Sequence, residues 1–308
     1  MLDPWDTMPV VMPAPQSIHT ALLARKTTAW ERYQQLELEG DGASPRRGHT
    51  VAGEVLARLE HAHQEHAASL EVARRALLDA GLEVKEVRWP TVSDTSAADL
   101  IVTVGGDGTF LRCAMHVVDV PMVGVNSSPT YSVGHYCGLV ADELPEFLGS
   151  LRAGDEELAW LPRIQGVVGS TPLPHMALND MLFCQRCPAA SSRYSITLGG
   201  RDERHISSGV WVATPSGSTS AIRSAGGHVQ AHDSKGLQYL VREAYSGLGG
   251  APDLTGGVFE EPLVLTPTSP DLMVFLDGHH QSYDVPLATP LVLHRVERSL
   301  PVYRYTLR

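Results

Sequence analysis

The chain has 308 residues and a formal net charge of −11, and no stripe of basic residues offsets this acidity, which argues against a nucleic-acid partner. Hydrophobic residues make up 43% of the sequence, enough for a core, yet no apolar run approaches the ~20 residues that span a bilayer. The length suits two domains of ordinary size or one large domain. The N-terminal segment lacks the basic and apolar regions of a secretory signal.

Cysteine usage indicates a reducing compartment. The chain has four cysteines, too few and too scattered for a disulfide framework. Cys184 and Cys187 form a lone C-x-x-C, and zinc would need a second pair of ligands that the sequence does not supply. The histidines also lack the spacing of metal ligands. We therefore expect no metal site built by the protein alone, two reduced thiols on a strand and at its exit, and a cytoplasmic location.

The first half of the sequence alternates between helical and strand-like patterns. In chain order we expect a strand at 10–12, a helix capped by Ser17 over 17–38, a loop at 40–48 and a long helix over 50–80 that Gly81 stops. Three strands follow, at 82–87, 100–104 and 122–125. A further helix follows Asp107, between the last two strands. This alternation predicts a parallel sheet with right-handed crossovers, whose ligands lie beyond the carboxyl ends of the strands.

The composition changes after about residue 150, where glycine, proline, serine and threonine become frequent. We expect one helix at 236–245 and short strands at 164–168, 181–183, 195–198, 210–213, 273–276 and 291–293. The second half is therefore predicted to be mostly β. We place the boundary between Phe147 and Trp160, which gives an α/β domain over 1–150 and a mostly-β domain over 151–308, with a tail that is free to return to the first domain.

One segment of the first half carries more chemistry than any other. Residues 99–112 read D-L-I-V-T-V-G-G-D-G-T-F-L-R, which predicts a buried strand, a glycine turn and a helix start. Glycines let backbone N–H groups approach an anion, and a helix N-terminus favours negative charge. In a loop that only binds phosphate, the negative charge of Asp107 would be unfavourable. In a site that transfers a phosphoryl group, the same carboxylate can hold Mg²⁺ or accept a proton. The alternatives are a plain tight turn and a side chain that caps the helix.

Three later segments combine turns with small polar residues. Residues 212–227 read V-A-T-P-S-G-S-T-S-A-I-R-S-A-G-G, which favours a flat or sugar-bearing ligand, with a flexible serine-glycine linker as the alternative. Ala177-Leu178-Asn179-Asp180 reads as a turn, and Phe275-Leu276-Asp277-Gly278 reads as a hairpin. Alone, neither of these two segments assigns a function.

Lysine is nearly absent from the chain. With only Lys26, Lys85 and Lys235 present, we expect any charge clamp on phosphate to fall largely to arginine, which suits bidentate contacts. Four arginines are candidates by position, each with a solvated surface role as the alternative: Arg46, Arg47, Arg112 and Arg223.

Together, the four segments resemble the ATP-NAD kinase family, from about Ala98 to the end of the chain. The family pattern is G-G-D-G-T, an Asn-Glu or Asn-Asp pair, T-P-[ST]-G-S-T-A-Y followed by S-A-G-G, and a late D-G turn. G-G-D-G-T is shared with diacylglycerol and sphingosine kinases, whereas the T-P-S-G-S-T and S-A-G-G block is similar to NAD kinases specifically. Residues 126–130, 187–190 and 237–243 resemble the divergent organellar branch of NADH kinases, which is homodimeric and accepts NADH as well as NAD⁺. Ser208 and Ala221 replace an aspartate and a tyrosine of the pattern.

The resemblance implies a two-domain fold, α/β and then mostly β, and transfer of a phosphoryl group from ATP to the 2′-hydroxyl of the adenosine ribose of NAD⁺ or NADH. It implies that Asp107 is the base or the Mg²⁺-linked acid of this step. The implied cradle for the ATP phosphates consists of Gly105, Gly106, Gly108 and Thr109. The implied NAD-binding residues are Asn179, Asp180, Ser216, Ser218, Thr219, Ser224, His135 and Tyr136, of which Tyr136 would stack near the adenine.

The resemblance also implies Mg²⁺, or another divalent cation, carried by the substrate phosphates, and a homodimer. It leaves open the preference between NAD⁺ and NADH and the choice between ATP and another phosphate donor. Two alternatives stay open as well: a lipid or sugar kinase that shares only the G-G-D-G-T loop, and an NAD(H)-binding sensor that has lost catalysis. The first predicts a hydrophobic acceptor pocket and no dependence on residues 216–227.

Overall fold

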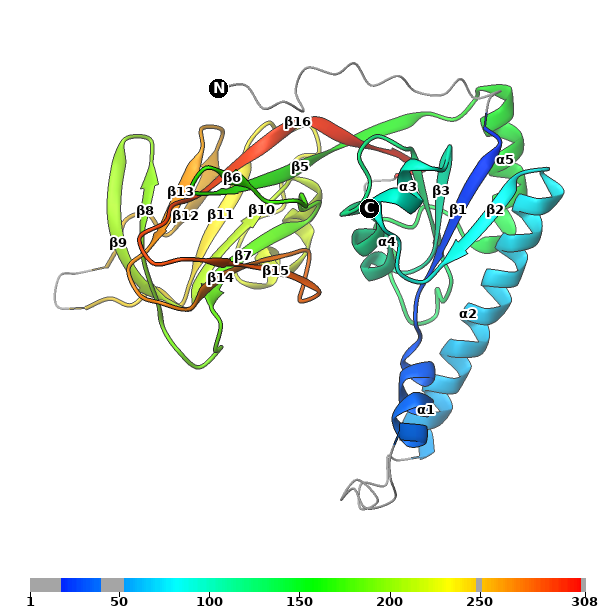
Figure 1. Ribbon diagram of the computed structural model, residues 1–308, viewed down its shortest axis with the longest axis horizontal. Coiled ribbons are helices and arrows are strands. Elements are labelled where there is room, and N and C mark those ends of the chain that lie inside the picture. The colour runs from blue at the N-terminus through cyan, green and yellow to red at the C-terminus, as the bar shows by residue number, and fades with distance from the viewer. Residues whose placement is uncertain (1–17, 40–52, 248–250, 306–308) are drawn as a thin grey trace. The chain divides into compact units, whose positions relative to one another are not determined.

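The structure is a computed structural model that describes residues 18–39, 53–247 and 251–305 (Figure 1). By their contacts, the described residues divide into two units, residues 18–159 with 301–305, and residues 160–300. The first unit is α/β with a parallel sheet and the second is mostly β, which confirms the predicted fold class. The strands β5 (Leu158–Val168) and β16 (Leu291–Tyr303) each run from one unit into the other. The expected strand at 10–12 and the expected loop at 40–48 lie outside the described residues.

Parallel strands form the centre of the first unit, in the order β2 (Glu83–Val87), β1 (Thr20–Arg25), β3 (Leu100–Gly105) and β4 (Met122–Asn126). The end of β16 pairs with β4, also in parallel. The apolar runs of β1, β3 and β4 are buried almost throughout, as is usual for strands that are covered on both faces. The register pairs Arg25 with Val104 and Gly105 with Asn126, so three strands end at the same edge of the sheet.

Helices cover the sheet of the first unit. The long helix α2 (Gly53–Asp79) contributes Leu70, Ala73 and Leu77 to the main apolar cluster, and Gly81 follows it with a φ of +74°. The other helices of this unit are α1 (Ala29–Glu39), α3 (Val92–Ser96), α4 (Asp107–Ala114), the 3₁₀ turn η3 (Ala141–Glu143) and α5 (Leu144–Ala153). In the described part of the chain, no helix is both long enough and apolar enough to cross a membrane.

The helix expected over residues 17–38 is wrong in its first part, because residues 20–25 form β1. This run lacks the alternation of a half-buried strand, since both of its faces are covered in the parallel sheet. The helix α1 begins only at Ala29, after a capping box. Thr28 Oγ1 accepts the N–H of Glu31 at 3.1 Å, and Glu31 Oε2 accepts the N–H of Thr28 at 2.8 Å. The sequence therefore did contain the signal for the true helix start.

A six-stranded antiparallel sheet dominates the second unit, in the order β12 (Gly256–Phe259), β11 (Leu237–Arg242), β10 (Gly209–Ala213), β7 (Asp180–Gln185), β14 (Leu272–Leu276) and β15 (Gln281–Val285). The remaining strands pair with β5, with β16 or with each other: β6 (Thr171–Pro172), β8 (Ser192–Leu198), β9 (Arg201–Ser207) and β13 (Leu263–Pro267). Between β10 and β11 lie the 3₁₀ turn η4 (Ser216–Thr219) and the short helix α6 (Ala221–Ser224). All six strands expected in this half are present.

The helix expected at residues 236–245 is wrong, because residues 237–242 form β11. This strand pairs with β10 on one side and with β12 on the other. Gln238, Tyr239 and Val241 are buried although they point to both faces. Continuous burial inside a sheet, rather than a helical period, explains the apolar spacing of this segment, and tyrosine and valine are common in strands.

Candidate active site

The glycine loop lies at the carboxyl end of β3, where the strand meets α4. Gly105 is the last residue of β3, Gly106 is the N-cap of α4, and Asp107 is its first residue. A Cβ on Gly105 would lie 2.3 Å from Thr109 Oγ1, and a Cβ on Gly106 would lie 2.7 Å from Ser132 Oγ. The turn therefore requires glycine at position 105, where the new Cβ would also lie 2.7 Å from Thr109 Cβ, whereas at position 106 the Ser132 hydroxyl would have to turn away. The result is a helix N-terminus whose backbone N–H groups attract anions.

Asp107 is half-buried, and one backbone group fixes its carboxylate. Its Oδ1 accepts the N–H of Tyr136 at 2.7 Å, while Oδ2 has no hydrogen-bond partner within the described ranges. The alternative that Asp107 caps α4 is wrong, since the N-cap is Gly106 and no side chain caps the helix. One carboxylate oxygen is thus oriented by the protein, and the other is left for a ligand or a proton.

Next to Asp107 lies a stack of three aromatic rings. The Tyr136 ring is 1% exposed and stacks on Phe110 at 5.2 Å and on Tyr305 at 5.8 Å between ring centroids. Contrary to expectation, this stack leaves neither face of Tyr136 for an adenine. His135 is half-buried, with its Nε2 3.2 Å from Tyr305 Oη. Burial and the charge of Asp107 raise the pKa of Tyr305 to about 12, so this phenol stays protonated.

The ends of the neighbouring strands flank the glycine loop. The N–H of Ser127 donates to Gly105 O at 2.9 Å, and the Ser127 hydroxyl lies 2.9 Å from His66 Nδ1. Burial lowers the pKa of His66 to about 4, and its Nε2 lacks a hydrogen-bond partner among the residues described. On the other side, Lys26 follows β1 and donates its backbone N–H to Val104 O at 3.3 Å. The loop therefore lies between the end of β1 and the end of β4.

In the second unit, a different set of expected residues gathers around Asp277. Its carboxylate accepts three consecutive backbone N–H groups, from Leu178 at 2.8 Å, Asn179 at 2.7 Å and Asp180 at 3.0 Å. Burial raises the pKa of Asp277 to about 7, and the charge of Asp180 adds to the rise, while the backbone hydrogen bonds oppose it. The late D-G turn thus fixes the Asn-Asp pair, a role that the hairpin signal alone does not reveal.

Asp180 is 6% exposed at the start of β7, and its Oδ2 accepts the Ser220 hydroxyl at 2.6 Å. Burial raises the pKa of Asp180 to about 6, against the effect of the hydrogen bond from Ser220. Asn179 is half-buried beside it. A carboxylate in such a desolvated place gains from further hydroxyl donors, such as those of a ribose.

The segment after β10 packs on the Asn-Asp pair. Thr214 Oγ1 donates to Leu178 O at 2.6 Å, and a Cβ on Gly217 would lie 2.0 Å from Asn179 O. Residues 214–218 are all buried. The flexible-linker alternative is therefore wrong, since this segment is a fixed part of the unit.

The expected hydroxyls of this segment divide into two inner and two outer ones. Ser216 is 2% exposed and Ser218 is 0% exposed, and Ser218 Oγ accepts the N–H of Gln230 at 2.9 Å. Thr219 is half-buried and Ser224 is exposed. The inner pair holds the segment together, whereas the outer pair is accessible to a ligand.

The two arginine candidates that the structure describes, Arg112 and Arg223, lie in surroundings that do not indicate a phosphate clamp. The guanidinium carbon of Arg112 lies 3.2 Å from the centroid of the Trp89 ring, so an aromatic face holds this side chain. Arg223 is exposed on α6, which is the surface position weighed as its alternative. Arg46 and Arg47 lie outside the described residues.

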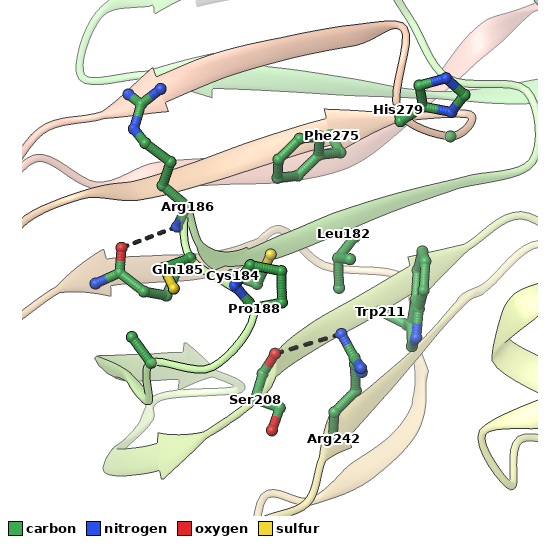
Figure 2. Close-up of a pocket in the computed structure, with 13 residues that line it drawn as sticks. Leu182, Cys184, Gln185, Arg186, Pro188, Ser208, Trp211, Arg242, Phe275 and His279 are labelled. Atoms are coloured by element: carbon green, nitrogen blue, oxygen red, sulfur yellow. Dashed lines mark hydrogen bonds between the residues drawn. The ribbon is translucent and has the colours of Figure 1, made fainter. Parts of the chain in front are cut away.

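A cavity of about 260 Å³ opens on the outward face of the six-stranded sheet (Figure 2). Leu182, Trp211 and Phe275 line it, and they are half-buried while their neighbours along each strand are buried. The guanidinium of Arg242 lies 6.0 Å from the centroid of the Trp211 ring, and its Nη1 donates to Ser208 O at 3.5 Å. The apolar side chains are thus flanked by two guanidinium groups, that of Arg242 and that of Arg186, which pairs with Asp284.

The predicted thiols lie where we expected them, Cys184 on β7 and Cys187 just beyond it, and both line the same cavity. All four cysteines of the chain are free. Among the described residues, no group of three or more histidine, cysteine, aspartate or glutamate side chains could hold a metal ion.

Comparison with solved structures defines the class of fold. The NAD kinase from Archaeoglobus fulgidus in complex with ATP has a TM-score of 0.65 at 20% identity, and the match covers 93% of this chain and 95% of that one. The yeast NADH kinase complexed with NADH has a TM-score of 0.61 at 16% identity, over 94% of this chain and 83% of that one. The chain therefore has the two-domain fold of the NAD kinases.

Comparison of sequences then defines the family. The family model described as the ATP-NAD kinase N-terminal domain matches residues 50–154. The probable NADH kinase of Oryza sativa subsp. japonica is 32% identical over 235 residues, which are 66% of this chain and 72% of the rice protein. The chain belongs to the ATP-NAD kinase family, as its motifs predict.

Proposed function

We propose that the chain is an NAD(H) kinase, which transfers the terminal phosphoryl group of ATP to the 2′-hydroxyl of the adenosine ribose of NAD⁺ or NADH. The observation that carries the proposal is Asp107 at a glycine loop, a carboxylate with one oriented oxygen and one that nothing in the described part of the chain engages. Asp107 accepts the proton of the 2′-hydroxyl as that oxygen attacks the γ-phosphorus. The bond to the bridging oxygen breaks, ADP leaves, and NADP⁺ or NADPH is formed.

The donor phosphates lie against the loop in this proposal. Gly105, Gly106 and Gly108 keep the backbone open, and Thr109 adds a hydroxyl in the first turn of α4. Phosphoryl transfer depends mainly on positioning and on neutralisation of charge, and a helix N-terminus contributes to both.

The acceptor is bound by the Asn-Asp pair. Asp180 accepts ribose hydroxyls, and Asn179 beside it donates to and accepts from the nucleotide. Asp277 holds this pair through its three backbone hydrogen bonds, and the buried Ser216 and Ser218 support the adjacent segment. The accessible hydroxyls of Thr219 and Ser224 line the dinucleotide. In the first unit, His135 is the residue that we expect to contact the adenine, and Tyr136 contributes through the backbone N–H that orients Asp107.

Mg²⁺ is the divalent cation that we expect to accompany ATP. In phosphoryl-transfer sites this ion is held by substrate phosphates and by one or two carboxylates rather than by a protein cage. Asp107 Oδ2, which lacks a partner among the described residues, fits that donor set. When bound, the ion would neutralise charge on the donor phosphates, and Asp107 would hold it there.

Ser208 supports the acceptance of NADH as well as NAD⁺. It stands where the family pattern has an aspartate, and the neighbouring charge is that of Arg242, whose Nη1 donates to Ser208 O. The nicotinamide ring is cationic in NAD⁺ and neutral in NADH. A negative side chain attracts only the cationic ring, so a site without that charge favours NAD⁺ over NADH less strongly. Ala221, which replaces the tyrosine of the pattern, is exposed and adds no charge.

Two further expectations belong to this proposal. A homodimer would cover the half-buried apolar side chains Leu182, Trp211 and Phe275, which share the outward face of the six-stranded sheet. The free thiols, with Cys113 and Cys137 in the interior, support a reducing and therefore cytoplasmic compartment.

One assay tests the function. The purified chain is incubated with ATP, Mg²⁺ and either NAD⁺ or NADH, and NADP(H) is measured. We expect product from both acceptors, and its loss in Asp107→Ala with NAD(H) binding retained. Tight NAD(H) binding without product would instead identify a sensor. Neither binding nor product would direct the search to lipid or sugar acceptors, which the 235-residue match to the rice protein does not favour.

A further inference from the structure

The carboxyl edge of the first sheet carries a lysine to which the steps above give no role. Lys26 directly follows Arg25, the last residue of β1, and donates its backbone N–H to Val104 O at 3.3 Å. Val104 immediately precedes the glycine loop. Neighbouring strands lie about 4.8 Å apart, so the backbone of Lys26 stands one strand spacing from the loop, within the reach of a lysine side chain.

Lys26 differs from the neighbouring cations because its ammonium has no partner among the described residues. Arg25 pairs with Glu31 at 3.3 Å and with Glu86 at 3.0 Å, and Arg88 pairs with Glu31 at 3.2 Å. Within the described stretches of the chain, Lys26 Nζ makes neither an ion pair nor a hydrogen bond. An ammonium that is half-buried and unpaired is costly to the fold, so an anion is the partner that this position favours.

The acid whose charge acts most on Lys26 is engaged elsewhere. Glu65 on α2 accepts the hydroxyl of Ser128 at 2.5 Å and that of Thr130 at 2.9 Å. Burial lowers the pKa of Lys26, and the charge of Glu65 offsets only part of this effect. The protein alone therefore leaves the ammonium under-compensated.

Lys26 and Asp107 act on a common neighbour. The charges of both reach the buried thiol of Cys137, where Asp107 raises the pKa and Lys26 lowers it, although burial is the main cause of the raised value. Cys137 follows Tyr136, whose N–H orients Asp107. The ammonium and the reacting carboxylate therefore share one neighbourhood in the first unit.

We propose that Lys26 binds the phosphate tail of the nucleoside triphosphate donor and supplies part of the counter-charge that the composition assigns largely to arginine. This inference rests on the proposed kinase function and adds a donor-binding residue to it. A lysine ammonium is a compact point charge with three donors, so it can contact one phosphate together with the backbone N–H groups of the loop. Lysine is rare in this sequence, but its rarity does not exclude any of the three lysines from a phosphate site.

The test compares Lys26→Met and Lys26→Arg with Lys85→Met as the matched control. Lys85 is an exposed lysine on β2 of the same sheet, paired with Asp94 at 2.6 Å. Loss of a charge-assisted contact should raise the KM and the calorimetric Kd for ATP about 10- to 100-fold in Lys26→Met. We expect the KM for NAD(H) to stay unchanged, Lys26→Arg to recover part of the ATP affinity, and Lys85→Met to behave as the original chain.

Several outcomes would overturn the proposal. An unchanged Kd for ATP in Lys26→Met would do so, and so would a rise confined to the KM for NAD(H). If Lys26 only balanced Glu65, the added change Glu65→Gln would restore ATP affinity to Lys26→Met, and we expect no restoration. A melting curve shows whether Lys26→Met folds, and Lys26→Gln replaces it if it does not.

The calorimetric arm separates this inference from the proposed function. It measures ATP binding without an acceptor, so it needs no turnover. An original chain that makes no NADP(H) would refute the kinase proposal. The comparison of ATP affinity between that chain and Lys26→Met would still decide whether Lys26 binds the triphosphate.

Discussion

Each of the two units places an Asp-Gly dipeptide shortly after a buried strand, Asp107-Gly108 after β3 and Asp277-Gly278 after β14. The Asp107 carboxylate accepts a single backbone N–H, and one of its oxygens is unengaged among the described residues. The Asp277 carboxylate accepts three N–H groups from consecutive residues. The same Asp-Gly dipeptide thus gives a carboxylate with an oxygen left for a ligand in the first unit and a structural anchor in the second.

In the proposed function, this difference separates the carboxylate that reacts from the one that positions its neighbours. Both aspartates lie in tight turns, so local sequence does not distinguish them. What distinguishes them is how many hydrogen bonds the rest of the unit donates to each carboxylate. In the proposed function Asp277 still serves the reaction, because the residues that it holds include Asn179 and Asp180.

The largest expected effects come from exchanging each aspartate for asparagine. Asp107→Asn should lower kcat about 10²- to 10⁴-fold, because the proton acceptor is lost, and leave the melting temperature unchanged. Asp277→Asn should instead destabilise the chain by about 2 kcal/mol, because an amide cannot accept all three N–H groups, and should raise the KM for NAD(H). Steady-state kinetics and thermal melts measure both. A normal melting curve for Asp277→Asn would contradict its role as an anchor.

The glycines of the two motifs should respond differently to alanine. In Gly217→Ala the new Cβ would lie 2.0 Å from Asn179 O, a backbone atom, so we expect a loss of about 1 to 3 kcal/mol of stability and a raised KM for NAD(H). A Cβ at Gly108 meets nothing within 4 Å, so Gly108→Ala should fold normally and raise only the KM for ATP. Melting temperatures and both KM values decide. An unaltered KM for ATP would remove Gly108 from the phosphate cradle.

The pH dependence of stability should have opposite signs in the two units. In the second unit the folded pKa values of Asp180 and Asp277, about 6 and about 7, lie above the ordinary 3.8. The folded unit then binds more protons than the unfolded one, and its stability falls as the pH rises from about 4 to 7. In the first unit the folded pKa of His66, about 4, lies below the ordinary 6.5. There the folded unit binds fewer protons, and its stability rises between about pH 4 and 6.5.

Hydrogen exchange of amides in β4 and β7, corrected for the intrinsic rate, reports the two slopes separately. Asp180→Asn should flatten the slope in the second unit, and His66→Gln should flatten that in the first. Slopes of the same sign in both units would show that these buried groups do not govern the dependence.

The smallest expected effect concerns the choice of acceptor. Ser208→Asp restores the negative charge of the family pattern beside Arg242, so the ratio of kcat/KM for NAD⁺ to that for NADH should rise by about 3- to 10-fold. Ser208→Asn, which adds the same size without the charge, is the control. An equal shift in both variants would assign the effect to shape and not to charge.

The fold was predictable from the sequence where a buried run ended in a clear signal. β3 and β4 were predicted because apolar runs stop at glycine or asparagine, and α2 was predicted because its apolar residues follow a helical period and Gly81 ends it. The errors at β1 and β11 share one cause. β1 is buried along nearly its whole length, and β11 buries Leu237, Gln238 and Tyr239 in succession, so neither strand alternates throughout. The partners that make them strands lie elsewhere in the chain.

The site was predictable where its chemistry is local. The loop with Asp107 could be interpreted from a dozen adjacent residues, but Asp277 acts on residues 97 to 99 positions earlier, and no local pattern records that contact. No local pattern marks Lys26 as a phosphate-binding candidate either, because only the pairing of β1 with β3 places its backbone beside the glycine loop. The rings on Tyr136 come from positions 110 and 305, so its burial could not be foreseen either. The catalytic role of Asp107 and the roles of the phosphate-binding and acceptor-binding residues stay predictions.

The stack of Tyr136 on Tyr305 has a consequence for how the enzyme is made. Tyr136 orients Asp107, and Tyr305 reaches it from the last described residues of the chain. A ribosome exposes the glycine loop long before it adds that tyrosine. A nascent chain that has not yet reached Tyr305 would therefore lack one of the two rings that pack on Tyr136, the residue whose N–H orients Asp107.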